Sequence, residues 1–344
     1  MAGKLISQKK KIYRVSQGLD KYLRTFNRGC RLPLGYEDLL RYSDSFALYD
    51  KNDDDTLWST VNYDHSERDE IHSGLLKIYA YIRADGDLTF MEHLIVDRID
   101  MCMYGNTKPF RIRITNTLND NFDYFYIKEA DASRIFGLEL EHILSPNRIG
   151  FFYFANTIVE EHIYGIPGDT FSEHYLNSKQ THAVRLAKEF VKFNERCFLR
   201  LLGDMHSANF VVDITMDFEG NFYRIRSIDF DQQSYEKEKK VYLPQFFPQN
   251  LPYVKVVMDQ LSTKSVEQYQ KEERALIKKR ILSSQYRLRS LLDVMEMAPT
   301  APRENIDNLA QQLSEHYESE LFATCNTMGA IVRTLLTMIE NGSI

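Results

Sequence analysis

Apolar and polar residues alternate along the chain from residue 110, and this period of two predicts β-strands. Phe110, Ile112 and Ile114 alternate with two arginines, which is the pattern of a half-buried strand. The polar run 118–121 follows, and after it comes a second run, 122–128, that is rich in aromatic residues. Two such runs around a short polar turn predict a β-hairpin.

The segment after this hairpin predicts a helix and then two more strands. Ser133 can cap a helix that runs to about Leu144, and Pro146 stands just beyond its end, where a helix does not continue. The runs 149–155 and 157–163 are dominated by aromatic and β-branched residues, which favour strands. The front half of the chain is therefore predicted to be rich in strands.

Apolar residues recur at helical spacing after Gly165, so the back half of the chain is predicted to be mainly helical. The elements expected there are a helix over 184–201, short strands over 209–213 and 222–228, and two long amphipathic helices over 277–295 and 306–339. A β-rich front half followed by a helical back half predicts an α+β fold.

Composition narrows the class of protein. The chain has 344 residues, of which 43% are hydrophobic, and this length suits about two compact cores. A net charge of −6 argues against a protein that coats nucleic acid. Four cysteines without a CxxC pair favour neither a disulfide framework nor a zinc site. No apolar run is long enough to span a membrane and no secretory signal is recognisable, so we expect a cytoplasmic protein.

One constellation in the back half has the spacing that phosphoryl transfer needs. The run 203–209 reads Gly-Asp-Met-His-Ser-Ala-Asn, so that Asn209 follows Asp204 by five residues, and 228–231 reads Ile-Asp-Phe-Asp after a predicted strand. Transfer of a phosphoryl group from ATP needs a carboxylate that orients or deprotonates the acceptor hydroxyl, and oxygen ligands that hold Mg²⁺ on the phosphates. Asp204 can supply the first group, and Asn209 and Asp229 can supply the ligands.

These two runs resemble the catalytic core of the protein-kinase-like superfamily, in its atypical branches. The run 203–209 is similar to the Gly-Asp-x-His-x-x-Asn loop of aminoglycoside and choline phosphotransferases, HipA-type toxin kinases and phosphoinositide kinases. The run 228–231 is similar to their Ile-Asp-Phe-Gly or Ile-Asp-Phe-Asp segment. The resemblance implies a bilobal protein-kinase-like fold with a β-rich N-lobe and a mainly helical C-lobe. It also implies that His206 braces the loop or assists catalysis, and it leaves Asp231 open as a second metal ligand or a turn carboxylate.

The elements of the front half have the order that they have in kinases: a strand with a lysine, a helix with a glutamate, and a strand that leads to a hinge. Lys128 ends the second strand of the predicted hairpin, where the resemblance implies a lysine that contacts the α- and β-phosphates of ATP. Glu139 in the next helix is the partner expected for Lys128, with Glu141 as the alternative. The strand and hinge that follow resemble those that offer backbone groups to adenine, so Glu161 and Ile163 are expected to bind ATP.

The sequence departs from the kinase pattern in three places. No Gly-x-Gly-x-x-Gly loop precedes the lysine strand, so the backbone amides of 118–121 are the candidates for covering the phosphates. Leu202 stands where the phosphotransferases have a histidine before Gly-Asp. No Ala-Pro-Glu segment follows Asp229, so a protein kinase that is regulated by loop phosphorylation is not expected.

An aromatic and proline-rich segment follows the second run. Three prolines within 244–252 stiffen the chain because each fixes φ and restricts the residue before it. The rings of Tyr242, Phe246 and Phe247 either wall the acceptor site or pack the back of the C-lobe. The first reading favours a closed cavity and a small-molecule acceptor.

The hypothesis that we favour is an ATP- and Mg²⁺-dependent phosphotransferase, which moves the γ-phosphate to a hydroxyl on a small molecule or a protein. The alternatives are a pseudokinase-type protein that binds a nucleotide or a partner, and transfer of AMP by the same constellation. The predicted divisions are 1–100 for an N-terminal extension and the start of the N-lobe, 101–164 for the N-lobe core with the hinge at its end, and 165–344 for the C-lobe with the catalytic loop.

Overall fold

The computed structural model describes residues 10–84, 86, 87, 89–103, 108–218 and 220–344. Within them the chain forms two compact units. The sheet unit comprises residues 14–130 and 149–162, and the helical unit comprises residues 10–13, 131–148 and 163–344. The segment 101–164 is therefore shared: its strands belong to the sheet unit, and its helix belongs to the helical unit.

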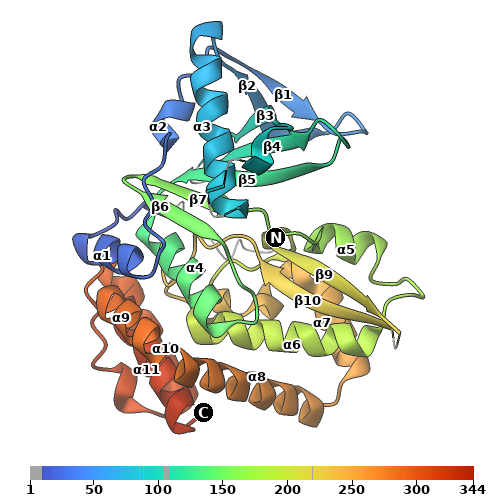
Figure 1. Ribbon diagram of the computed structural model, residues 1–344. Coiled ribbons are helices and arrows are strands. Elements are labelled where there is room, and N and C mark those ends of the chain that lie inside the picture. The colour runs from blue at the N-terminus through green and yellow to red at the C-terminus, as the bar shows by residue number, and fades with distance from the viewer. Residues whose placement is uncertain (1–9, 85, 88, 104–107, 219) are drawn as a thin grey trace. The chain divides into compact units, whose positions relative to one another are not determined.

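The sheet unit is built on an antiparallel sheet, in which seven described strands follow the order β1-β2-β3-β4-β5-β7-β6. Helix α3 lies along this sheet (Figure 1) and packs on β3. The elements are α1 (Gln17–Thr25), α2 (Tyr36–Leu39), β1 (Asp44–Tyr49), β2 (Asp55–Asn62), α3 (His65–Arg83), the short 3-10 helix η1 (Thr89–Met91), β3 (Leu94–Cys102), β4 (Phe110–Asn116), β5 (Phe122–Glu129), β6 (Phe151–Phe154) and β7 (Thr157–Glu161).

The predicted hairpin is confirmed as strands β4 and β5. Their register runs from Phe110 opposite Ile127 to Thr115 opposite Phe122. Phe110 and Ile112 are fully buried and belong to the apolar core of the sheet unit. The period of two in β4 thus reflects one buried and one more exposed face.

The predicted helix and the two strands after it are also confirmed, as α4 (Ala132–Leu144), β6 and β7. The capping residue differs from the prediction. Asp131 caps α4, since its side chain accepts a hydrogen bond of 3.2 Å from the backbone N–H of Ser133. An aspartate two residues before a serine competes well for this position because its carboxylate also complements the helix dipole.

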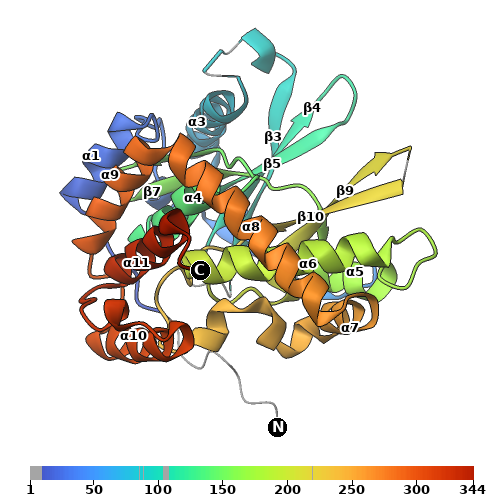
Figure 2. The ribbon, with the colours of Figure 1, turned by 90° about the horizontal axis from the view of Figure 1, so that it is seen from below.

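The helical unit is organised around α6, which contacts α7, α8 and β10. Figure 2 shows α8 passing along α6, and α11 beside α9. The remaining elements are β8 (Ile166–Pro167), α5 (Gly168–His174), α6 (Ala183–Arg200), η2 (Ser207–Asn209), β9 (Phe210–Asp217), β10 (Gly220–Ser227), η3 (Lys239–Tyr242), η4 (Pro244–Phe246), η5 (Pro248–Asn250), α7 (Leu251–Gln260), α8 (Thr263–Ser283), α9 (Gln285–Glu296), α10 (Arg303–Tyr317), η6 (Glu320–Phe322) and α11 (Met328–Asn341).

The prediction of two long helices near the C-terminus is wrong, because each predicted helix is divided into two. The first is divided at Ser284 into α8 and α9. The second is divided after Tyr317, where Glu318 has a left-handed φ of 49°, into α10 and α11. The apolar spacing continues across both breaks because the helices on either side bury residues in the same unit, and neither break carries a glycine or proline that would reveal it.

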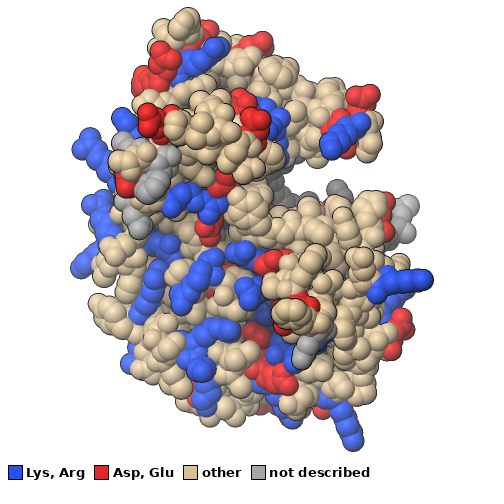
Figure 3. Space-filling model, turned by 45° about the vertical axis from the view of Figure 1, so that its right-hand side comes forward, with Lys and Arg blue, Asp and Glu red and all other residues tan. Residues whose placement is uncertain are grey.

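No helix in the described part of the chain is both long enough and apolar enough to cross a membrane. On the face that Figure 3 presents, acidic and basic side chains occur together on both units. This mixture agrees with the small net charge, and neither unit is covered by charges of a single sign on that face.

Candidate functional site

The loop 203–209 connects helix α6 to strand β9 and is held by the chain that follows β10. The backbone N–H of Gly203 donates to the carbonyl of Gln232 at 3.2 Å, and the N–H of Asp204 donates to the carbonyl of Val241 at 3.3 Å. These bonds fix the loop beside the segment that carries the second predicted run. The helical unit therefore brings the two motifs of the sequence analysis together.

Asp204 and Asn209 are joined within this loop. The side-chain Nδ2 of Asn209 donates to the backbone oxygen of Asp204 at 2.8 Å. Asp204 has a φ of 61°, in the left-handed region that few residues other than glycine adopt and that aspartate tolerates better than most. Such backbone conformations cluster at functional sites. Because Nδ2 of Asn209 is used by Asp204, its Oδ1 faces a different direction and is a potential ligand atom.

The carboxyl group of Asp204 lies in an excess of negative charge. Burial raises its pKa from the usual 3.8 to about 7, and the carboxylates of Asp229, Glu236 and Asp231 shift the pKa in the same direction. The basic group within ion-pair distance among the described residues is His206, at 3.9 Å. A carboxyl group that titrates near neutral pH is suited to accepting a proton from a hydroxyl.

His206 makes the contacts of a residue that supports the loop. Its backbone N–H donates to the carbonyl of Asp204 at 2.9 Å, and its Nδ1 accepts from the N–H of Ala208 at 3.3 Å. Burial lowers the pKa of its imidazole, and its ring lies 6.2 Å from that of Phe247. These contacts agree with the bracing role, and the catalytic role of His206 stays a prediction.

Arg134 of helix α4 contacts the predicted metal ligand, and the sequence analysis did not identify it. Its Nη1 lies 2.9 Å from Oδ1 of Asp229 and 2.7 Å from Oδ1 of Asp231. Arg134 is only 1% exposed, and its contact with Asp231 is better shielded from water than its contact with Asp229, whose side chain is 35% exposed. A single arginine within an apolar helix forms no motif, and the burial of α4 on nearly all sides depends on the tertiary structure.

Lys10 is a second buried cation beside the run 228–231. Its Nζ donates to the backbone oxygen of Asp231 at 2.6 Å and forms a buried ion pair with Asp131. Asp131 also accepts from the N–H of Tyr13 at 3.1 Å. The segment 10–13 is therefore attached to the start of α4 and to the end of the second motif, and nothing in the N-terminal sequence predicted this contact.

The predicted metal ligands have suitable chemistry. Asn209 and Asp229 offer oxygen atoms, which Mg²⁺ prefers, and the excess negative charge around Asp204 favours a cation. Among the described residues, no group of three or more His, Cys, Asp or Glu side chains is arranged to hold a metal ion. Arg134 shares Oδ1 of Asp229. Asn209 and Asp229 therefore fit a Mg²⁺ ion that phosphates help to coordinate, and this role stays a prediction.

Lys128 lies in the sheet unit and is buried. Its Nζ donates to Oε2 of Glu160 on β7 at 3.1 Å and lies 5.5 Å from the centre of the Tyr126 ring. Glu139 lies in the helical unit, where both of its carboxylate oxygens accept from Arg287 at 2.8 Å. The pairing of Lys128 with Glu139 stays a prediction.

The alternative partner, Glu141, also makes its contacts within the helical unit, and its pairing with Lys128 likewise stays a prediction. Its carboxylate is buried and pairs with Arg200, and it also accepts from Ser145 at 2.5 Å and from Asn147 at 2.8 Å. These donors occupy both oxygens of the carboxylate. Glu141 is thus a structural residue that joins α4 to α6, and the spacing in sequence could not distinguish it from Glu139.

The turn 118–121 lies at the opposite end of β5 from Lys128. The register places Thr115 and Phe122 at one end of the hairpin, and Lys128 lies six residues further along β5, a distance of about 20 Å. The prediction that this turn covers the phosphates is therefore hard to combine with the prediction that Lys128 contacts them.

The two predicted adenine-binding residues lie at the end of β7 and beyond it. The N–H of Glu161 donates to the carbonyl of Gly150 at 3.0 Å, and its side chain accepts from the N–H of the same glycine at 2.7 Å. Ile163 belongs to the helical unit and is buried. Their part in binding ATP stays a prediction.

The three aromatic rings after the second motif do not form one wall. Tyr242 is fully buried, and its hydroxyl donates to the backbone oxygen of Glu236 at 2.6 Å. Phe246 is 51% exposed. Phe247 is buried and is the ring that contacts His206. The short 3-10 helices η3 to η5 turn the rings in different directions, so this segment no longer favours a small-molecule acceptor.

Comparison with known proteins yields little. No family model matches the chain, and no curated protein sequence matches it. A solved structure, the PAN3 pseudokinase of Neurospora crassa, is similar at 11% identity over 81% of this chain and 70% of that chain, with a TM-score of 0.18. A TM-score this low carries no argument. The architecture itself, a β-rich sheet before a helical part, is compatible with a kinase-like bilobal fold.

Proposed function

We propose that the chain is an ATP-dependent phosphotransferase whose acceptor site lies at Asp204. The observation that carries this proposal is the geometry of the loop 203–209. One loop holds a carboxyl group of raised pKa and the side-chain amide of Asn209, and Asp229 is close enough to raise that pKa. Phosphoryl transfer needs these groups and little further covalent chemistry from a protein.

In this reaction the acceptor hydroxyl attacks the γ-phosphorus, the bond to the β–γ bridging oxygen breaks, and ADP leaves. Asp204 orients the hydroxyl and takes its proton, for which a pKa of about 7 is suitable. Asn209 and Asp229 would hold Mg²⁺, which would neutralise phosphate charge. Lys128 contacts the phosphates, and His206 keeps the loop in place.

A second function is favoured by one observation, the contact of Arg134 with Asp229. A buried guanidinium on both Asp229 and Asp231 already neutralises carboxylate charge that a divalent ion would otherwise neutralise. A pseudokinase-type protein that binds nucleotide without a divalent ion would use this arrangement. The two functions differ in whether Mg²⁺ strengthens nucleotide binding.

Isothermal titration calorimetry with ATP, in the presence and absence of MgCl₂, tests the proposal. For the phosphotransferase we expect Mg²⁺ to tighten ATP binding by about tenfold or more, because Asp229 would hold the ion and the ion would neutralise phosphate charge. Asp229→Asn should lose this gain. Asp213→Asn on β9 removes the same charge at a site with no predicted ligand role, and it should behave as the parent.

Equal ATP binding with and without Mg²⁺ would favour the pseudokinase function. No ATP binding under either condition would overturn both functions.

A further inference from the structure

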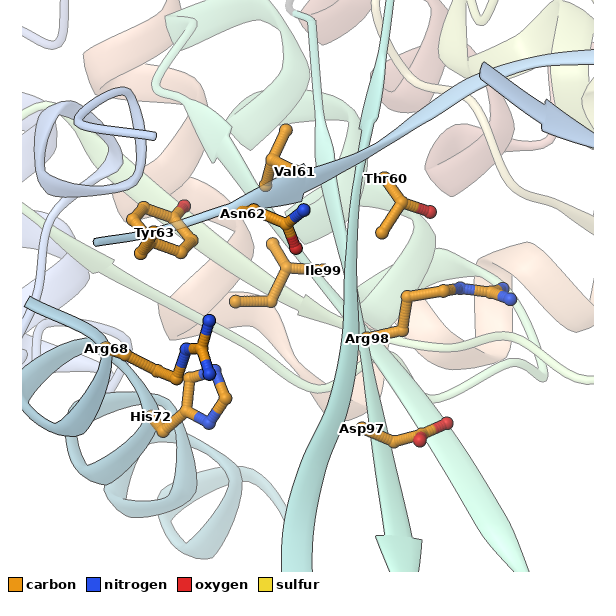
Figure 4. A pocket seen from close by; sticks show the side chains of 9 residues that line it. All are labelled: Thr60, Val61, Asn62, Tyr63, Arg68, His72, Asp97, Arg98 and Ile99. Carbon is orange, nitrogen blue, oxygen red and sulfur yellow. The ribbon is translucent and has the colours of Figure 1, made fainter. Parts of the chain in front are cut away.

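A cavity of about 240 Å³ lies in the sheet unit between helix α3 and strands β2 and β3 (Figure 4). Its lining is more polar than apolar, and the buried residues Val61, Tyr63 and Ile99 form the apolar part. Arg68 and His72 project from α3 toward this part, as Figure 4 shows. None of the residues with a predicted role in binding ATP lines this cavity.

Three polar side chains that line the cavity, two on α3 and one at the end of β2, have no hydrogen-bond or ion-pair partner within the described chain. The structure gives no hydrogen bond or ion pair to the side chains of Arg68, His72 or Asn62 in the part of the chain that it describes. The two glutamates nearest in sequence are used elsewhere, since Glu67 and Glu70 both pair with Arg41 at 3.2 and 3.5 Å. Arg68 is exposed, and no carboxylate lies within ion-pair distance of its guanidinium among the described residues.

The other two charged residues of the lining are already neutralised. Asp97 pairs with Arg113 at 3.0 Å, and Arg98 pairs with Asp100 at 2.9 Å. In Figure 4 the side chains of Asp97 and Arg98 are directed away from Arg68. Burial lowers the pKa of His72, so its imidazole is neutral at pH 7 and offers one N–H. The cavity thus combines one cation, neutral donors and an apolar part.

We propose that this cavity binds a small organic carboxylate, with the guanidinium of Arg68 on the carboxylate and the apolar body of the ligand against Ile99. A single planar guanidinium matches a monoanionic carboxylate in charge and in geometry. His72 and Asn62 supply further hydrogen bonds to the ligand. A bare phosphate would satisfy Arg68 but would leave the apolar part in contact with water. The proposal uses no residue of the loop 203–209, so the experiments with ATP do not bear on it.

Benzoate and benzamide are suitable probes, because they have the same shape and only benzoate is charged. Binding is measured by calorimetry and by the shift of the His72 ring resonances in NMR spectra of the full chain. We expect benzoate to bind at millimolar concentration or below and benzamide to bind at least about tenfold more weakly, which is the contribution of a charge-assisted hydrogen bond. Inorganic phosphate should bind more weakly than benzoate.

Arg68→Gln should weaken benzoate binding by about tenfold. Lys77→Gln is the matched control, since it removes the same charge from an exposed position of α3 that does not line the cavity, and it should bind benzoate as the parent does. Equal affinities of benzoate for the parent and for Arg68→Gln would overturn the proposal. Equal affinities for benzoate and benzamide, tighter binding of phosphate, or no binding of benzoate at millimolar concentration would overturn it as well.

Discussion

Asp100 in the sheet unit and Asp204 in the helical unit are both withdrawn from water, but their surroundings are opposite. Asp100 is fully buried, and it accepts from Thr60 at 2.8 Å, from Arg98 at 2.9 Å and from Arg111 at 2.8 Å. Asp204 is 26% exposed by its side chain, and its neighbours are carboxylates rather than arginines.

This difference is the one expected between a structural carboxylate and a functional one. A buried charge that serves only the fold is surrounded by donors, because an unpaired buried charge is costly. At Asp204 part of this free-energy cost is not offset by donors, and the raised pKa of its carboxyl group reflects it. Carboxylates in such an environment are frequent at sites that bind ligands or transfer protons. The free energy of unfolding of variants at the two positions therefore tests the contrast.

Asp100→Asn should be the most destabilising change, by about 3 kcal/mol, because it leaves two arginines without their shared carboxylate. Urea denaturation of the folded chain measures this loss. Asp97→Asn is the control, since its ion pair with Arg113 is more exposed and should contribute at most about 1 kcal/mol. Equal losses in the two variants would remove the basis for treating Asp100 as a structural centre.

Lys128→Met should cost about 2 kcal/mol, because it leaves the buried carboxylate of Glu160 without this partner. It should also weaken ATP binding by about tenfold if Lys128 contacts the phosphates. The double variant Lys128→Met/Glu160→Gln should regain much of the stability and none of the ATP affinity. Recovery of both together would show that Lys128 acts only through the fold.

Arg134→Met should lower stability by about 1 to 2 kcal/mol, because Asp229 and Asp231 lose the guanidinium that they share. Added MgCl₂ should then stabilise this variant more than the parent, since the ion replaces the missing cation. Thermal unfolding with and without MgCl₂ gives the comparison. The same Mg²⁺ effect on both proteins would contradict the assignment of Asp229 as a metal ligand.

Asp204→Asn should change stability in the opposite direction to Asp100→Asn. The folded pKa of Asp204, about 7, is above its usual value of 3.8, so the folded state binds more protons than the unfolded state between these pH values. Stability of the parent therefore falls as the pH rises from 4 to 7 through this group. Relative to the parent, the variant should gain up to about 4 kcal/mol at pH 8 and little at pH 4. Parallel stability curves for the two proteins would show that Asp204 is not in an unfavourable environment.

The sequence predicted the parts of the fold that depend on short-range patterns. The period of two gave β4 correctly, and Pro146 marked the end of α4. It gave no prediction for α3, although Ile71, Leu75 and Ile78 are spaced as on one helix face and all are fully buried. Gly74, a residue that disfavours a helix interior, lies within that spacing and obscured it, and this helix forms one side of the cavity at Arg68.

The candidate site was predictable where its residues form a motif and not where they meet through the fold. Asp204 and Asn209 are five residues apart, and their contact within one loop follows from that spacing. Arg134 lies 95 residues before Asp229, and Lys10 lies 221 residues before Asp231. Contacts over such separations depend on tertiary packing, which no local pattern in the sequence records.

The release of phosphate from ATP in the presence of Mg²⁺, measured for the parent and for Asp204→Asn, tests the proposed function most directly. The parent should turn over ATP, and the variant should be slower by roughly 10²-fold or more while it binds ATP with similar affinity. Asp213→Asn should match the parent. Equal turnover in the parent and Asp204→Asn, or ATP binding by the parent without any turnover, would contradict the assignment of Asp204 as the residue that activates the acceptor.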